Sequence, residues 1–403
     1  MLNKIFTFVF LLIVFCDNGI AKTRFENIEI IALEIAKELG FSINNKTYLQ
    51  RMDKLAKNIK ANNAGKEKIV DTIIKHIYSI PENVDKKPTI LEEEGLLNVL
   101  LDQGTGNCFS YSILFLSLGN RLGVEFQPIL IPGHIYLKYK KQNIETTLNG
   151  KNLSDNNIAK LLYLDPGKIK FVQASKEQLV SSIYSNACLL AGYKKLFQGG
   201  IKFCNKAIKY NRDNGEAFIN RSYINGVLGE LNKSFKDAKE GVRLYPESSH
   251  AHSTMGLAYR RLGKRSEAVE AYKKSISIRP NLFRTHYNLG NIFLDIGKFN
   301  EAISSFSEAI HLKNNYTNAY KNRGIAYSLI KNHLKAIGDY TYILNTVPGD
   351  FEILFERGKA YYALKKYGLA IKDFEKMQKL FPEKSKKEEI GAIIVDLKKI
   401  RGQ

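Results

Sequence analysis

The amino-acid sequence predicts an α+β domain in the N-terminal half of the chain and an all-helical solenoid in the C-terminal half. Between Val124 and Thr147, three short stretches of strand-forming residues follow a helical region, as in a small sheet packed on helices. From residue 179 onward, prolines, glycines and alanines recur every 34 residues, which is typical of stacked helical hairpins. A chain of 403 residues has room for two or three such domains.

Residues 1–21 predict a signal peptide. Apolar residues run from Ile5 to Cys16, and Gly19 and Ala21 occupy small-residue cleavage positions. The run is shorter than the roughly 20 residues that a membrane-spanning helix needs. We therefore expect an exported protein, periplasmic or secreted, with no stable membrane span after signal cleavage. A lipoprotein modified at Cys16 is a weaker alternative, because the bulky Phe15 precedes that cysteine.

The formal net charge of +21 allows two interpretations. A basic chain can bind nucleic acid, an anionic membrane or acidic proteins. Alternatively, abundant lysines simply cover solvated helix faces, and this is the interpretation we prefer. The sequence contains no RNA-binding signature, Walker loop, dinucleotide fingerprint or HExxH motif. We therefore expect no cofactor, no metal and no nucleic-acid partner.

The first domain is expected over residues 22–178. Helical periodicity extends from Lys22 to about Leu100, and a further helix is expected from Cys108 to about Leu122, with Asn107 as its N-cap. Strands are expected over the stretches 124–131, 134–139 and 143–147.

Three reactive side chains follow one another in this region. A cysteine at a helix N-terminus, such as Cys108, lies where the helix dipole favours a thiolate. A hairpin centred between Tyr139 and Lys140 would place His134 directly opposite Glu145. A thiol, a base and an orienting acid are the parts of a nucleophilic site. Each residue alone also has an ordinary structural interpretation, as a core cysteine or a loop histidine.

The passages Gly106-Asn107-Cys108, Pro132-Gly133-His134 and Asn143-Ile144-Glu145-Thr146-Thr147 resemble the bacterial transglutaminase-like domain that commonly precedes tetratricopeptide repeats. The resemblance implies a papain-like α+β fold. It also implies that Cys108 is the nucleophile, His134 the general base and Glu145 the orienting acid.

The resemblance further implies that the backbone N–H of Cys108 meets the oxyanion, helped by the side chain of Gln103 or Asn107. Two departures from better-studied transglutaminases stand out. Glu145 replaces the usual aspartate, and Phe109 replaces the tryptophan that often follows the cysteine. The second departure leaves the type of substrate open.

Residues 179–382 predict six tetratricopeptide repeats. Proline occurs at 246, 280, 348 and 382, with Asn314 in the missing place. The last four repeats carry a glycine on the first helix, an alanine on the second and aromatic residues around them. Residues 383–403 are expected to form a C-terminal capping helix. The recurring small residues are Gly256, Gly290, Gly324, Gly358, Ala268, Ala302, Ala336 and Ala370.

Tetratricopeptide repeats usually bind a peptide or a partner helix on the concave face, which the first helices line. If the first helices of this chain line a concave face in the same way, the residues on that face are basic and partly aromatic. Such a face would suit an acidic protein or peptide. The alternative is that these residues are ordinary solvated side chains. The set is His250, Arg260, Arg284, Tyr287, Asn291, Lys321, Lys359 and Tyr362.

Three cysteines remain after signal removal. If a disulfide forms, Cys188 and Cys204 on the facing helices of the first repeat are the pair, which leaves Cys108 free. We favour the alternative that Cys188 and Cys204 are small packed hydrophobic residues.

Two functions are consistent with the sequence. The first is a cysteine hydrolase (protease or amidase) or an acyltransferase that cleaves or transfers an amide bond of a peptide or protein held by the repeats. Hydrolysis is favoured over transfer, because nothing identifies a second amine substrate. The alternative is a non-catalytic interaction scaffold with a structural transglutaminase-like domain.

Overall fold

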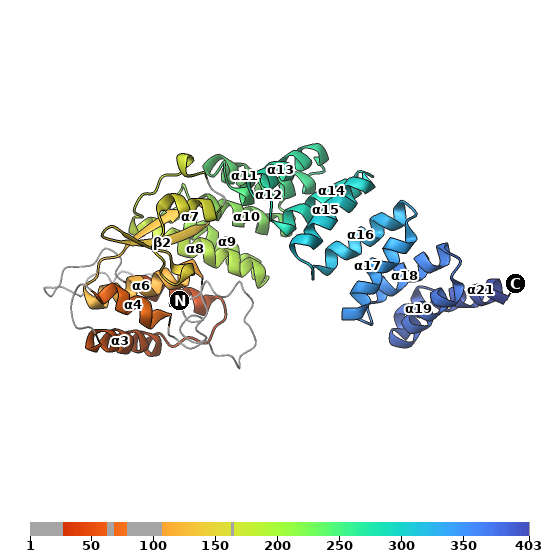
Figure 1. Ribbon diagram of the computed structural model, residues 1–403, viewed down its shortest axis with the longest axis horizontal. Coiled ribbons are helices and arrows are strands. Elements are labelled where there is room, and N and C mark those ends of the chain that lie inside the picture. Colours follow the sequence, from red (N-terminus) through yellow and green to blue (C-terminus); the bar gives the residue numbers. More distant parts are fainter. Residues whose placement is uncertain (1–26, 63–67, 79–106, 163–164, 403) are drawn as a thin grey trace, which may run out of the picture. The chain divides into compact units, whose positions relative to one another are not determined.

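The computed structural model describes residues 27–62, 68–78, 107–162 and 165–402. The expected signal peptide and Gln103 lie outside the described residues. The chain divides into two compact units (Figure 1), and each is described by itself. The first unit comprises Met1–Asp155 with Lys170–Asn186, and the second comprises Asn156–Ile169 with Ala187–Gln403.

The first unit combines helices with a small antiparallel sheet. The strands follow in the order β1-β2-β3, and β2 pairs with both neighbours. Helix α6 packs against α2, α3 and β2, and its apolar residues are buried along most of its length. The elements are α2 (Ile28–Glu38), α3 (Asn45–Ala61), α4 (Ile69–Ile77), α6 (Cys108–Leu122), β1 (Gln127–Ile131), β2 (His134–Tyr139), β3 (Gln142–Ile144) and the short 3-10 helix η3 (Thr146–Leu148).

The predicted strand register is wrong by one residue on each side of the turn. Leu137 pairs with Ile144 and Tyr139 with Gln142, so the turn is centred between Lys140 and Lys141. Lys140 adopts a left-handed backbone conformation with φ of 53°. The residues of this turn are not typical turn formers, since neither glycine nor asparagine occupies it. The shift leaves His134 and Glu145 on the same face of the sheet, because the pairing moves by one residue on each strand.

The second unit consists mainly of helical hairpins, and the hairpins of Figure 1 follow one another from green to blue. Its first hairpin begins with α8, which starts in the first unit. Before the hairpins lie α7 (Asp155–Leu161) and the 3-10 helix η4 (Pro166–Lys168). The hairpins are α8 (Lys176–Tyr193) with α9 (Phe197–Tyr210), α10 (Gly215–Val227) with α11 (Leu231–Leu244), α12 (Ser249–Arg261) with α13 (Arg265–Ile278), α14 (Phe283–Asp295) with α15 (Phe299–Leu312), α16 (Thr317–Leu329) with α17 (His333–Thr346), and α18 (Phe351–Ala363) with α19 (Tyr367–Leu380).

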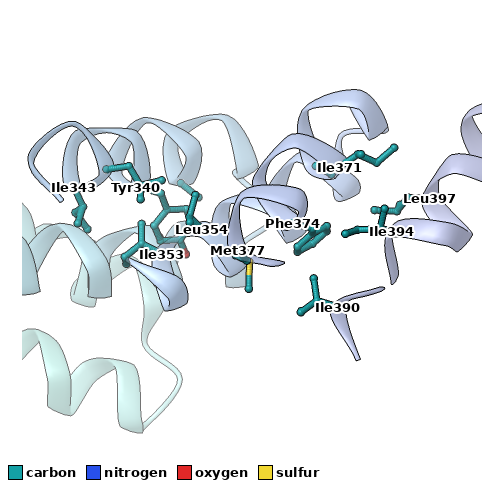
Figure 2. Close-up of a cluster of buried hydrophobic side chains, with 13 residues drawn as sticks. Tyr340, Ile343, Ile353, Leu354, Ile371, Phe374, Met377, Ile390, Ile394 and Leu397 are labelled. Atoms are coloured by element: carbon teal, nitrogen blue, oxygen red, sulfur yellow. The ribbon is translucent and has the colours of Figure 1, made fainter. Parts of the chain in front are cut away.

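The last hairpin is covered by two short helices, α20 (Pro382–Lys387) and α21 (Ile390–Gly402), where the sequence predicted one capping helix. Glu389, with φ of 54°, lies at the break between them. Figure 2 shows how Ile390, Ile394 and Leu397 join Phe374 in one buried cluster. The cap therefore closes the hydrophobic core at this end of the solenoid.

Close contact between the two helices of a hairpin depends on glycine. A methyl group added at Gly290 would lie 2.6 Å from the ring of Phe306, and one at Gly324 would lie 2.6 Å from the ring of Tyr340. Real carbon atoms do not approach that closely, so any larger residue would push the aromatic ring or the helix away.

A second recurring contact was not foreseen from the sequence. The guanidinium of Arg323 makes a two-pronged ion pair with Asp339, at 2.7 and 2.9 Å, and also donates to Ser307 Oγ at 3.0 Å. The aspartate lies in the same repeat and the serine in the preceding one, so each arginine joins two repeats. The same arrangement links Arg357 with Asp373 and Thr341, and Arg221 with Asp237 and Asn205.

Cys188 and Cys204 form a disulfide that joins α8 to α9. Our preference for two packed thiols is therefore wrong. Both side chains are fully buried, so burial alone did not distinguish packed thiols from a bonded pair. Cys108 is the free cysteine among the described residues, as predicted.

We predict opposite effects of two glycine substitutions in the repeats. Gly290→Ala should lower the free energy of unfolding by about 1–3 kcal/mol, because the methyl group collides with Phe306. Gly338→Ala is the matched control. Gly338 is an exposed residue of helix α17, and no atom lies near the added methyl group. The substitution should therefore raise the free energy of unfolding by up to about 1 kcal/mol. Urea unfolding followed by circular dichroism measures both, and a stabilising Gly290→Ala would contradict the packing described here.

Candidate functional site

Cys108 is the first residue of α6. The side chain of Asn107 caps this helix by accepting hydrogen bonds from the backbone N–H groups of Phe109 (2.9 Å) and Ser110 (3.3 Å), and Ser110 Oγ accepts in return from the backbone N–H of Asn107. The cap fixes the first turn, where the N–H groups have no intrahelical acceptor. The thiol is largely buried, with 9% of the residue exposed. Sequence reasoning placed this cysteine and its cap correctly.

His134 is the first residue of β2. The preceding Gly133 has φ of 73°, a conformation that favours glycine, and this tight turn from β1 delivers the histidine at the strand end. The imidazole is buried, and its Nε2 lies 2.8 Å from Glu145 Oε2. Nδ1 is the ring nitrogen that does not contact Glu145.

Glu145 follows β3 and is 3% exposed. In the observed register it lies diagonally from His134 across the β2–β3 pair, within reach of a long side chain. Its second oxygen, Oε1, accepts hydrogen bonds from the Thr147 hydroxyl (2.6 Å) and the Thr147 backbone N–H (3.0 Å). Both carboxylate oxygens are therefore satisfied, which a buried charge requires.

The site favours charged forms of the histidine and the glutamate. Burial alone would lower the pKa of His134, but its partners Cys108 and Glu145 outweigh burial and raise that pKa from 6.5 to about 10. Burial would raise the pKa of Glu145, yet the hydrogen bonds from His134 and Thr147 lower it. An imidazolium next to a carboxylate is thus the stable form at neutral pH.

Residues that sequence reasoning missed hold this group in place. The Tyr78 hydroxyl donates to the backbone carbonyl of Thr146 at 2.6 Å, and the hydroxyl of Thr146 lies 3.5 Å from the carbonyl of Cys108. Thr147 could have been found from the sequence, because it follows Glu145 within a turn-forming Thr-Thr-Leu-Asn-Gly run. Tyr78 gave no such signal, since it is far from the site along the chain.

A polar network lies on the same face of the sheet. Asp155 accepts hydrogen bonds from the Tyr136 hydroxyl (2.6 Å), Lys138 Nζ (2.7 Å) and Asn143 Nδ2 (2.8 Å). These bonds join β2 and β3 to the start of α7. They fix the two strands that present His134 and Glu145.

The predicted oxyanion donors are placed only in part, because Gln103 lies outside the described residues. The side-chain oxygen of Asn107 is engaged by the helix cap. The backbone N–H of Cys108 belongs to the first turn of α6, where N–H groups have no intrahelical acceptor.

The predicted groove residues have different surroundings. Arg260 pairs with Asp295, Lys321 with Glu352, and Lys359 with Glu356. Tyr287 and Asn291 both accept hydrogen bonds from Asn322 Nδ2. Tyr362 is exposed and packs near Tyr367. His250 and Arg284 line a cavity among the first helices of the first four hairpins.

Two features are absent from residues 27–62, 68–78, 107–162 and 165–402. No group of three or more His, Cys, Asp or Glu residues is arranged there to hold a metal ion. None of the helices found in those ranges combines the length and the apolar character that crossing a membrane requires.

Comparisons with known proteins agree with this arrangement. Residues 46–181 match the family model of the transglutaminase-like superfamily. Residues 256–297, 290–330 and 351–384 match tetratricopeptide-repeat models. No curated protein matches the chain.

Several solved structures resemble part of the chain. PilW, described as a widely conserved type IV pilus biogenesis factor, is 18% identical over 51% of this chain and 94% of its own, with a TM-score of 0.48. The Pseudomonas aeruginosa protein pilF is 13% identical over 53% of this chain and 96% of its own, with a TM-score of 0.47. YrrB, a TPR protein with an unusual peptide-binding site, is 18% identical over 45% of this chain and 93% of its own, with a TM-score of 0.40.

The chain is therefore a two-part protein in which a domain of helices and a small antiparallel sheet precedes a helical-repeat domain. Specifically, it carries a transglutaminase-like domain followed by tetratricopeptide repeats.

We predict that His134 keeps its proton well above the ordinary histidine range. In an NMR titration of the imidazole resonances, His134 should titrate near pH 10, and Glu145→Gln should lower its midpoint by more than about one unit, because the carboxylate no longer stabilises the charge. The protonated form is stabilised by folding, so this contribution to stability is present below about pH 6.5 and is lost as the pH rises towards 10. A His134 midpoint near 6.5 that is the same in the protein and in Glu145→Gln would contradict the buried pair.

Proposed function

We propose that the transglutaminase-like domain cleaves an amide bond of a peptide or protein through Cys108, while the repeats hold that polypeptide. The observation that carries the proposal is the buried Nε2–Oε2 contact of 2.8 Å between His134 and Glu145, and Cys108 is the other group that raises the pKa of the ring. A thiol, a histidine and an orienting acid in this order match the papain-like arrangement that the family resemblance implies.

The chemistry follows from the protonation of the site. When His134 carries the thiol proton, the Cys108 thiolate attacks the amide carbon and a tetrahedral oxyanion forms. In this proposal the backbone N–H of Cys108 and the side chain of Asn107 stabilise that oxyanion. The imidazolium then donates its proton to the leaving nitrogen as the C–N bond breaks, which leaves a thioester on Cys108.

Water completes the reaction in the hydrolytic version. Neutral His134 takes a proton from the attacking water, the C–S bond breaks, and a carboxylic acid and the free thiol are released. Transfer would need an amine in place of water. Nothing in the described part of the chain identifies a site for such an amine, and hydrolysis is the version we propose.

Export is part of the proposal. The apolar leader at residues 5–16 has the length of a secretory signal. The Cys188–Cys204 disulfide supports an oxidising compartment, where such bonds persist.

An assay of general peptide hydrolysis tests the catalytic claim. Unfolded casein incubated with the protein should acquire new amino termini, and Cys108→Ser should abolish their formation. Glu145→Gln should slow the reaction by about 100-fold or more, because the histidine loses the group that orients it.

The control for this assay is Asp339→Asn, which alters a buried ion pair in the repeats and leaves the site intact. It should retain the hydrolysis rate as long as the chain stays folded. Incorporation of a fluorescent amine into casein, without new amino termini, would overturn hydrolysis in favour of transfer. Equal rates for the protein and Cys108→Ser would overturn the proposal altogether.

A further inference from the structure

A cavity of about 310 Å³ lies in the second unit, among the first helices α8, α10, α12 and α14 of successive hairpins. Its wall is largely apolar and includes Leu257 and Ile224. Three large apolar or aromatic side chains at the cavity, Leu189, Tyr193 and Tyr223, are 38–41% exposed to solvent. Exposed apolar side chains around a hollow of this size favour the binding of a bulky apolar group.

Three chemically different side chains border the cavity at one repeat position. Glu216, His250 and Arg284 follow one another at intervals of 34 residues, each as the second residue of its helix. Within the described ranges, neither Glu216 nor Arg284 has a hydrogen bond or an ion pair, whereas Glu352 at the same position of a later repeat pairs with Lys321. An acid, a neutral imidazole and a cation therefore line the cavity in that order.

Arg284 and Glu216 would each favour a ligand group of opposite charge. Arg284 is a cation in the first turn of α14, where the helix dipole disfavours positive charge, so a carboxylate from a ligand would be favoured by both the guanidinium and the helix. Glu216 has no neighbouring cation, and the surrounding wall raises its pKa to about 7 by burial. A basic group from a ligand would supply the missing cation.

The distance between the two charges sets the length of the ligand. Packed helices lie about 8–10 Å apart, so Glu216 and Arg284, two repeats apart, are separated by about 16–20 Å. An extended polypeptide covers that span with about five or six residues.

We propose that this cavity binds an extended polypeptide segment in which a bulky apolar side chain lies between an acidic residue, held by Arg284, and a basic residue, held by Glu216. The inference rests on the proposal that the repeats hold a polypeptide, but it does not depend on catalysis at Cys108. It also refines the expected partner. From the sequence we expected an acidic peptide, whereas the cavity would favour a peptide with one acidic and one basic residue in a set order.

A phage-displayed library of random decapeptides tests the inference. The library is selected on the full chain carrying Cys108→Ala, so that bound peptides are not cleaved. The selected peptides should share an apolar residue flanked by one acid and one base, about five residues apart. On Glu216→Arg the base should be replaced by a second acid, and on Arg284→Glu the acid should be replaced by a second base.

Lys273→Glu is the matched control, since Lys273 is already paired with Glu270 and lies on α13, outside the cavity. It should leave the selected pattern unchanged. If a charge reversal unfolds the chain, Glu216→Gln and Arg284→Gln replace it, and each should lose selection for one charge only. A failure to enrich any shared pattern, or a pattern that neither variant changes, would overturn the inference. Either result leaves the hydrolysis assay unaffected.

The affinity for a selected synthetic peptide should also depend on pH. Binding should strengthen by about threefold or more from pH 6 to pH 8 as Glu216 loses its proton, and Glu216→Gln should abolish the change. The other titratable groups around Glu216 are His250, Asp213, Tyr193, Tyr223 and Tyr245. The pKa of His250 is lowered by burial and by Arg279 and Arg284, which favours the neutral imidazole. An affinity that does not change with pH would contradict the role of Glu216.

Discussion

The buried contact between His134 and Glu145 is the interaction on which the proposed chemistry depends. Removing a carboxylate from water costs several kcal/mol unless its oxygens are satisfied. Here one carboxylate oxygen of Glu145 contacts the imidazole and the other accepts hydrogen bonds from Thr147. The buried carboxylate is thereby stabilised in its charged form. The sheet, the Asp155 network and the Tyr78 hydrogen bond keep these groups within hydrogen-bonding distance.

The repeats apply a different constraint. In each of the last four hairpins, a glycine on the first helix leaves space for an aromatic ring of the second helix. Arginines that pair with an aspartate of their own hairpin also donate to a hydroxyl of the preceding hairpin, and this second bond joins the two. Two of the four hairpins at the cavity lack the recurring glycine, and Glu216 and Arg284 have no hydrogen bond or ion pair within the part of the chain that the structure describes. This irregularity is what makes a recognition site chemically distinct from the surrounding scaffold.

Much of this architecture follows from sequence patterns that have a direct physical cause. The helix from Cys108 to Leu122 was predicted with both ends correct, because Asn107 caps one end and Gly123 terminates the other. The β2–β3 register was missed, since a turn through Lys140 and Lys141 has no distinctive residue. The predicted groove cations were treated as available, yet Arg260, Lys321 and Lys359 find acids on neighbouring turns or helices. Pairing between helices depends on three-dimensional placement that a single repeat pattern does not contain.

The central claim is that Cys108 and His134 form a reactive pair, and the rate of alkylation measures it most directly. Labelling of Cys108 by iodoacetamide would be followed by peptide mapping from about pH 5 to about pH 9, in the protein and in His134→Ala. The account predicts rapid labelling already near pH 6 in the protein, and in the variant a rate that rises about tenfold per pH unit, as for an ordinary thiol. The same steep rise in both would contradict a thiolate–imidazolium pair and, with it, the proposed hydrolysis.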